Sequence, residues 1–283
     1  MNRHARFFRT TARAVLRRAI LGGVAAAALV VAGCGGSGYG GSTSAPPPAA
    51  ASKSTVTMGA ITAFSTGGVT LNGMQFQAGS AVVSIDGASG QLASLHVGDV
   101  VQVRGHHDDG GGDDVADEID FRGDVRGPVS AIDTTAQTLV VLGQTVAVSA
   151  DTSFDDDISP ASLAGVHVGD IVEVSGMPAA EGTIHATRIE GKPPGSTFQV
   201  VGAASNTDAT AKTLNINALA VDFATATLKD FAAGAPQDGD LIEAHGTVIE
   251  ANGALQATSL QRLNGADLRD AQDDAARVEG LIT

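Results

Sequence analysis

The sequence predicts an all-β protein made of three tandem small five-stranded barrels. A Gly-Asp turn followed by an apolar strand occurs at residues 98–99, 169–170 and 239–240, so the copies are about 70 residues apart. Apolar and polar residues alternate in the strand that follows, which places one face in a core and the other in water. Glycines mark the expected corners, as they do in small barrels. These patterns together predict one β unit in three copies.

The first 33 residues predict a cleaved export signal. Six arginines and no acidic residue precede an apolar stretch at residues 19–31. Small residues follow this stretch. A basic segment, a short apolar segment and a small-residue cleavage site are the parts of a secretory signal. The apolar stretch is shorter than the roughly 20 residues that a membrane-spanning helix needs. We therefore assign residues 1–33 to a signal peptide.

Residues 31–34, Val-Ala-Gly-Cys, resemble the lipobox of bacterial lipoproteins. In that family the signal is cut before the cysteine, which becomes the lipidated N-terminus, and Cys34 is the only cysteine here. The resemblance implies a lipid anchor in the cell envelope, and Gly35 implies the outer membrane, facing the periplasm. The alternative is a soluble secreted protein with an unpaired cysteine, which is uncommon. Residues 34–55, rich in Gly, Ser and Pro, are expected to form a flexible tether.

Each barrel is expected to repeat the same order of strands. We place the three copies at residues 56–122, 125–192 and 198–263. Asn72-Gly73 lies between two apolar runs and predicts a two-residue hairpin turn, because both positions of a type I′ turn have positive φ. The three-residue spacing from Ala116 to Ile119 breaks the alternation and predicts a β-bulge in the closing strand.

The order of these landmarks resembles the bacterial family named domain of unknown function 5666, which consists of tandem OB-like barrels often found on lipoproteins. The resemblance covers residues 56–263 and rests on the strand-initial glycine, the Gly-Asp turn and the Ala-Thr-Arg-Ile segment at residues 186–189. It implies an OB-like fold and an envelope location, and no activity. Residues 264–283 are expected to form a polar connector followed by a strand like the first strand of each repeat. That strand would either complete the sheet of the third copy or begin a truncated fourth repeat.

The aspartates of the Gly-Asp turns are expected to be structural. Asp99, Asp170 and Asp240 occur in every copy, and an aspartate beside a glycine of positive φ can bond the turn backbone. His96 and His167 precede the turn in two copies. For these histidines we expect a hydrogen bond to a loop rather than a catalytic role.

One loop of the first copy is dense in possible metal ligands. Its candidate residues are His106, His107, Asp108, Asp109, Asp113 and Asp114. Carboxylates suit Ca²⁺, and imidazoles favour Zn²⁺, Ni²⁺ or Cu²⁺, so a divalent cation is the one cofactor that the sequence suggests. The spacing matches no EF-hand loop or zinc motif. The alternative is an acidic hairpin tip surrounded by solvent, because runs of charge are usually solvated.

Composition and motifs argue against several classes of function. The net charge is −14, and loss of the arginine-rich signal makes the remaining chain more acidic, whereas nucleic-acid binding needs a basic surface with stacking aromatics. Sugar binding favours exposed Trp or Tyr, and the chain has no Trp and one Tyr. The common hydrolase, metalloprotease and phosphate-binding motifs do not occur.

The sequence thus predicts a lipid-anchored, non-enzymatic interaction or scaffolding module. Its partners would be the membrane, through the lipid, and an unidentified envelope protein. A cation-binding module that uses the acidic loop is the first alternative. An enzyme of unknown class is the second.

Overall fold

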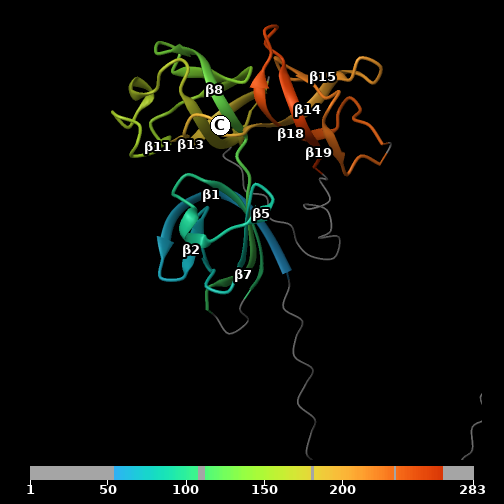
Figure 1. The fold of residues 1–283 in the computed structure, drawn as a ribbon. Coiled ribbons are helices and arrows are strands. Elements are labelled where there is room, and N and C mark those ends of the chain that lie inside the picture. Colours follow the sequence, from blue (N-terminus) through green and yellow to red (C-terminus); the bar gives the residue numbers. More distant parts are fainter. Residues whose placement is uncertain (1–53, 108–111, 180–181, 233, 264–283) are drawn as a thin grey trace, which may run out of the picture. The chain divides into compact units, whose positions relative to one another are not determined.

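The computed structural model describes residues 54–107, 112–179, 182–232 and 234–263 (Figure 1). These residues form strands joined by turns, together with two single-turn 3₁₀ helices, Leu92–Ser94 and Leu163–Gly165, and no α-helix. The predicted all-β class is therefore confirmed. Within the described ranges, no helix is long and apolar enough to cross a membrane.

The strands fall into three groups that share one order: an opening strand, a hairpin, one or two short strands and two closing strands. We call these groups repeats 1, 2 and 3. Repeat 1 contains β1 (Ser54–Ser65), β2 (Gly68–Leu71), β3 (Met74–Gln77), β4 (Val82–Ile85), β5 (Ala88–Ser89), β6 (Val100–His106) and β7 (Asp114–Phe121). Repeat 2 contains β8 (Val125–Asp133), β9 (Thr138–Val141), β10 (Gln144–Ala147), β11 (Ser153–Phe154), β12 (Ile171–Pro178) and β13 (Thr183–Gly191). Repeat 3 contains β14 (Phe198–Asp208), β15 (Thr213–Ile216), β16 (Leu219–Asp222), β17 (Thr227–Lys229), β18 (Leu241–Ile249) and β19 (Leu255–Arg262).

The strands assemble into two sheets. Repeat 1 forms a seven-stranded sheet in the order β3-β2-β1-β6-β7-β4-β5, in which β3 also pairs with β7. Repeats 2 and 3 form one twelve-stranded sheet, because the opening strands β8 and β14 pair with each other in antiparallel fashion. The hydrophobic core is divided in the same way, with one cluster inside repeat 1 and one shared by repeats 2 and 3.

The expectation of three separate five-stranded OB-like barrels is wrong. The first sheet has seven strands, and the second runs through two consecutive repeats without a break. The residues that join repeats 2 and 3 are buried in the shared core, so neither repeat encloses a core of its own. The chain is organised as successive β coils that share strand pairings, as the coils of a β-solenoid do, rather than as independent barrels.

The predicted hairpin turn is confirmed at Asn72-Gly73. These residues have φ values of 50° and 77° and connect β2 to β3, where Leu71 pairs with Met74. Two residues of positive φ are what a type I′ turn requires.

The predicted bulge is also confirmed, and each repeat has one in its closing strand. Opposite each bulge, the register shifts next to a glycine within the strand that follows the Gly-Asp turn. This glycine is Gly105, Gly176 or Gly246. The bulge brings backbone very close to this glycine. A Cβ atom on Gly176 would lie 2.4 Å from the carbonyl oxygen of His185, so the position admits only glycine without a backbone shift.

Candidate functional site: a charged cluster between the repeats

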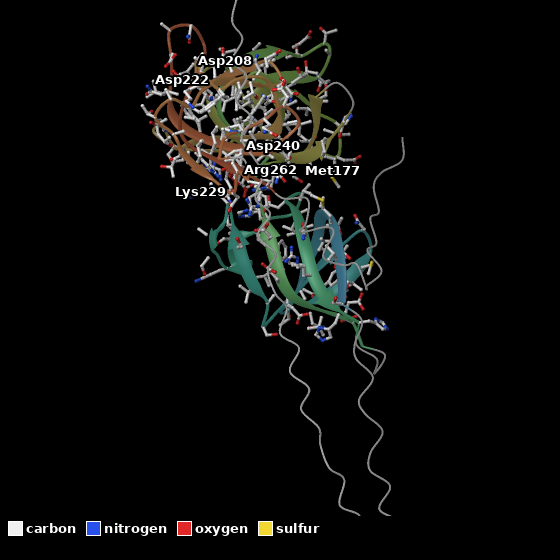
Figure 2. All side chains as sticks on the ribbon, turned by 90° about the vertical axis from the view of Figure 1, so that its right-hand side faces the viewer. Met177, Asp208, Asp222, Lys229, Asp240 and Arg262 are labelled. Atoms are coloured by element: carbon white, nitrogen blue, oxygen red, sulfur yellow. The ribbon has the colours of Figure 1, made fainter. Side chains whose placement is uncertain are left out.

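The three Gly-Asp turns are built alike. In each, the aspartate carboxylate accepts a hydrogen bond from the backbone N–H three residues earlier, at 2.7 Å for Asp99, 2.8 Å for Asp170 and 2.9 Å for Asp240. The preceding glycines have φ values of 98°, 98° and 88°. The structural role predicted for these aspartates is confirmed. In repeat 3, Asp240 also accepts a bond from Arg262 at 2.7 Å (Figure 2).

The turn of repeat 1 differs because it is buried against repeat 2. Asp99 is 3% exposed, and a Cβ atom on Gly98 would lie 2.7 Å from the carbonyl oxygen of Thr187. The next amide, of Val100, donates to the Ser175 hydroxyl at 2.8 Å. Burial raises the pKa of Asp99 to about 6, although the hydrogen bond from the His96 amide opposes this shift.

Beside this turn, a group of opposite charges extends over the surface of repeat 2. Arg188 Nε donates to one Glu190 oxygen at 2.6 Å, and Lys192 Nζ donates to the other at 2.6 Å. His96 Nδ1 lies 3.0 Å from Glu190. Burial alone would raise the pKa of Glu190, but the bonds from Lys192 and Arg188 hold it below its ordinary value.

A second group surrounds Arg126 on the opening strand of repeat 2. Its guanidinium contacts Asp86 of repeat 1 and donates through Nε to Glu173 at 2.9 Å. Lys192 contacts the other oxygen of Glu173 at 2.6 Å, which links the two groups. The two acidic partners hold the pKa of Arg126 above its ordinary value, although burial opposes this.

The short connection between repeats 1 and 2 extends the contacts to repeat 3. Arg122 donates to Glu243 at 2.9 Å, and the Gln199 amide donates to the Gly123 carbonyl at 3.0 Å. Asp124 accepts a bond from the Gly176 amide at 2.8 Å. Burial raises the pKa of Asp124 to about 7, and the backbone hydrogen bonds only partly oppose it.

We call this set the junction cluster. Its members are Asp86, His96, Asp99, Arg122, Asp124, Arg126, Glu173, Arg188, Glu190, Lys192 and Glu243. Four of its ion pairs join residues of different repeats or of the connection between repeats, namely Asp86–Arg126, His96–Glu190, Asp99–Arg188 and Arg122–Glu243. The remaining pairs among its members lie within one repeat. Its clearest capacity is therefore to hold repeats together. A partly buried pair is stabilised only if each charge keeps its partners, because an unpaired buried charge is costly.

Within the described residues, His96, Asp99 and Glu190 form a group whose ligand atoms lie within 4.8 Å of one another. Such a trio has the right atoms for a metal ion. However, both oxygens of Glu190 already accept bonds from Arg188 and Lys192, and these cations would repel a divalent ion. The trio therefore fits an ion-pair role better than a metal centre.

The residues predicted to bind a cation are only partly brought together. His106 Nδ1 lies 2.9 Å from Asp117, and His107 Nδ1 lies 2.5 Å from Asp114. Asp113 instead accepts a bond from Gln77 at 2.9 Å. Asp108 and Asp109 lie outside the described residues, as do Cys34, the signal, residues 35–53 of the predicted tether and residues 264–283. The last two residues of the predicted tether, Ser54 and Thr55, belong to β1 instead.

Sequence reasoning missed the junction cluster. Glu173 lies on an alternating strand, at a position predicted to face water, but it is 5% exposed and paired with Arg126 and Lys192. One signal was present: at the positions of Arg126 and Arg188, only repeat 2 has a basic residue. Repeat 1 has Met58 at the position of Arg126, counted from the strand-initial glycine. Charges unique to one copy indicate a local contact rather than the common fold.

An open cavity of about 700 Å³ lies beside the cluster, between residues 165–172 and residues 191–198. Its lining is mainly apolar or glycine, and its charged members are Asp157, Asp170 and Lys192. Lys192 is already paired with Glu173 and Glu190.

Comparison with known families gives one match. Residues 58–120 and 126–190 each match the family described as Domain of unknown function (DUF5666). The chain contains two tandem DUF5666 domains. They correspond to repeats 1 and 2, so the junction cluster lies largely where two DUF5666 domains meet.

Other comparisons add little. A search of curated proteins finds no match. Among solved structures, the chain is similar to "drosophila Unr CSD456" at 13% identity, covering 76% of this chain and 99% of that one, with a TM-score of 0.22.

Proposed function

We propose that the protein is a lipid-anchored, non-enzymatic scaffold of the bacterial cell envelope. In this proposal Cys34 carries the lipid, residues 35–53 form the tether, and the three repeats are presented to an envelope protein from the periplasmic face of the outer membrane. The junction cluster supports the scaffold role most directly. Its charges pair consecutive repeats with each other, as a protein that must present several surfaces in fixed order requires. The lipobox-like segment supports the anchor.

The anchor is tested with a Cys34→Ala variant of the full chain in a bacterial host. We expect the wild type to incorporate a palmitate analogue and to fractionate with outer membranes. The variant should incorporate none and appear in the soluble fraction. If both chains fractionate identically, or if the wild type carries no label, the anchor is wrong.

The scaffold role is tested by cross-linking in intact cells, with and without a chelator. We expect one defined envelope protein to be cross-linked to exposed positions of the repeats, and to persist when divalent cations are removed. A matched Arg126→Met variant should lose this product if the paired repeats present the surface. A wild type that yields no specific product would contradict the scaffold proposal.

Cation binding by the acidic loop is a second proposal. It is supported by the close approach of His107 to Asp114 and of His106 to Asp117. Calorimetric titration of chelator-treated protein with Ca²⁺, Zn²⁺, Ni²⁺ and Cu²⁺ tests it. The comparison variant replaces His106, His107, Asp108, Asp109, Asp113 and Asp114 with alanine. Binding that disappears in this variant supports the site, and equal binding by both proteins rejects it.

A further inference from the structure

Repeats 2 and 3 meet through equivalent residues. Val125 pairs with Val200, and each lies two residues before the strand-initial glycine of its repeat. The flanking contacts are reciprocal: Arg126 pairs with Gln199, and the Val201 amide donates to the Asp124 carbonyl at 2.9 Å. An antiparallel contact between equivalent positions is the arrangement of a twofold interface.

The hairpin tips of the two repeats extend this contact. Asn217 Nδ2 donates to Gln144 Oε1 at 2.6 Å, and Gln144 Nε2 donates to the Ile216 carbonyl at 3.1 Å. A Cβ atom on Gly143 would lie 2.8 Å from the Leu219 nitrogen, so the tips are in close contact. Gln144 is fully buried and Leu219 is 4% exposed.

We call the start of the opening strand and the tip of the next hairpin the pairing surface of a repeat. In repeat 1 it consists of Thr57, Met58, Asn72, Gly73 and Met74. Within it, Thr57 is 3% exposed and Asn72 Nδ2 donates to the Met58 carbonyl at 3.0 Å, whereas Met58 is 39% exposed and a Cβ atom on Gly73 would have nothing within 4 Å. The described strands place β6 on one side of residues 54–60 of β1 and no strand on the other.

We infer that the pairing surface of repeat 1 binds the pairing surface of repeat 1 in a second copy of this chain. The internal contact between repeats 2 and 3 supplies the geometry, with Thr57 of each copy at the position of Val125 and Val200. The surface has features of a self-pairing edge, namely a strand that has no described neighbouring strand on one side and an exposed methionine, Met58. A twofold contact closes after two copies, so the product is a dimer.

A second copy fits better than an unrelated partner because the equivalent surfaces of repeats 2 and 3 already pair with each other within the chain. Met58 would face Val56 of the other copy, as Arg126 faces Gln199. Met74 would contact the opposite Asn72, as Gln144 contacts Asn217. The inference does not depend on the lipid anchor or the cation site, since none of these residues belongs to either.

Sedimentation velocity of residues 34–283 with Cys34→Ser tests the dimer without a lipid or a disulfide. We expect a concentration-dependent increase to twice the monomer mass. Met58→Asp should weaken the dimer at least tenfold, because it places a charge in the desolvated contact of each copy. Val82→Asp is the matched control: Val82 is 68% exposed on β4 of the same repeat, outside the pairing surface, so this variant should dimerise normally.

Hydrogen exchange identifies the surface used. By analogy with Val201, the Met58 amide would donate across the dimer, so its exchange should slow as protein concentration rises. In the Met58→Asp variant, the amide at position 58 should exchange at a rate independent of concentration. A monomer at every concentration, a dimer unaffected by Met58→Asp, or a dimer without protection at residue 58 would each overturn the inference.

Discussion

At the scale of single residues, Gly176 shows how the bulge restricts the sequence. Gly176→Ala should destabilise the protein by more than about 2 kcal/mol, because the new methyl group would lie 2.4 Å from the His185 carbonyl oxygen. Chemical denaturation measures this difference. Gly191→Ala is the control, since its Cβ would meet its nearest neighbour only at 3.8 Å and the residue does not have positive φ. Equal costs for the two substitutions would contradict the steric explanation.

Asp124 is expected to make stability depend on pH. Its pKa in the folded protein is about 7, above the ordinary value of 3.8, so the folded state binds a proton that the unfolded state releases. Its contribution to stability is therefore complete below about pH 4 and is lost as the pH rises through 7, at about 1.4 kcal/mol per unit of pKa difference.

Asp124→Asn should remove this dependence, because an amide oxygen can still accept the bond from the Gly176 amide. Denaturation curves measured between about pH 4 and pH 9 compare the two proteins. We expect similar stability at the acidic end and a more stable variant at the alkaline end. A constant difference across the range would contradict a raised pKa. Asp99, whose pKa is raised to about 6, remains as a smaller source of the same trend in both proteins.

The sequence predicted these residues unequally. The turn at Asn72-Gly73 and the bulge depend on neighbours in the chain, so local patterns were sufficient to predict them. The burial of Asp99 was not predictable in this way, because the same Gly-Asp motif at Asp170 and Asp240 is more exposed. What differs is the repeat that packs against it.

At the scale of elements, β8 depends on the ion pairs of Arg126. Arg126→Met should destabilise the protein by about 3–5 kcal/mol, because it leaves Glu173 and Asp86 without this cation in a mostly buried position. Arg104→Met is the matched control: the Arg104–Glu118 pair is 3.5 Å long, its side chains are 39% and 44% exposed, and its loss should cost under about 1 kcal/mol. Thermal and chemical unfolding of both variants provide the comparison. A cost for Arg126→Met no larger than that of the control would show that the cluster does not hold β8 in place.

The strands themselves were predictable because the alternation of apolar and polar residues indicates which side chains face a core. It does not indicate which residues pack against the other face of the strand. Glu173 occupies a polar position of its strand, yet it is buried beside Arg126 and Lys192. The strand pattern was therefore read correctly, while the junction cluster on its outer face was not visible.

At the scale of the whole molecule, repeats 2 and 3 are expected to unfold as one unit. They share a sheet and a core, so Leu214→Ala in repeat 3 should lower the opening free energy of β12 amides in repeat 2 by about as much as that of β18 amides, some 2–5 kcal/mol. Native-state hydrogen exchange measures these energies. The control is Ile61→Ala, whose side chain lies in the separate core of repeat 1 and should chiefly affect β6. Unchanged β12 amides in the Leu214→Ala protein would contradict a shared unit.

The number of repeats was predictable at this scale, but their merger was not. Three copies of one sequence pattern predicted three separate barrels of similar size. The merger depends on hairpin tips, where Leu142 and Leu219 are buried against the neighbouring repeat and the equivalent positions of repeat 1 are not. The sequence period gives the number of repeats, whereas a few residues at the hairpin tips determine which repeats share a sheet and a core.

The contact between repeats 2 and 3 joins two surfaces that a short connection, residues 192–197, already tethers. Such a tether maintains each surface at an effective concentration in the millimolar range near the other. Dilution in the cell therefore has no influence on this pair, and even a weak contact remains closed at one molecule per cell. A mutation at the hairpin tips of repeats 2 and 3 would cause local opening of this contact and not dissociation of two molecules. Its effects should therefore be the same at every expression level.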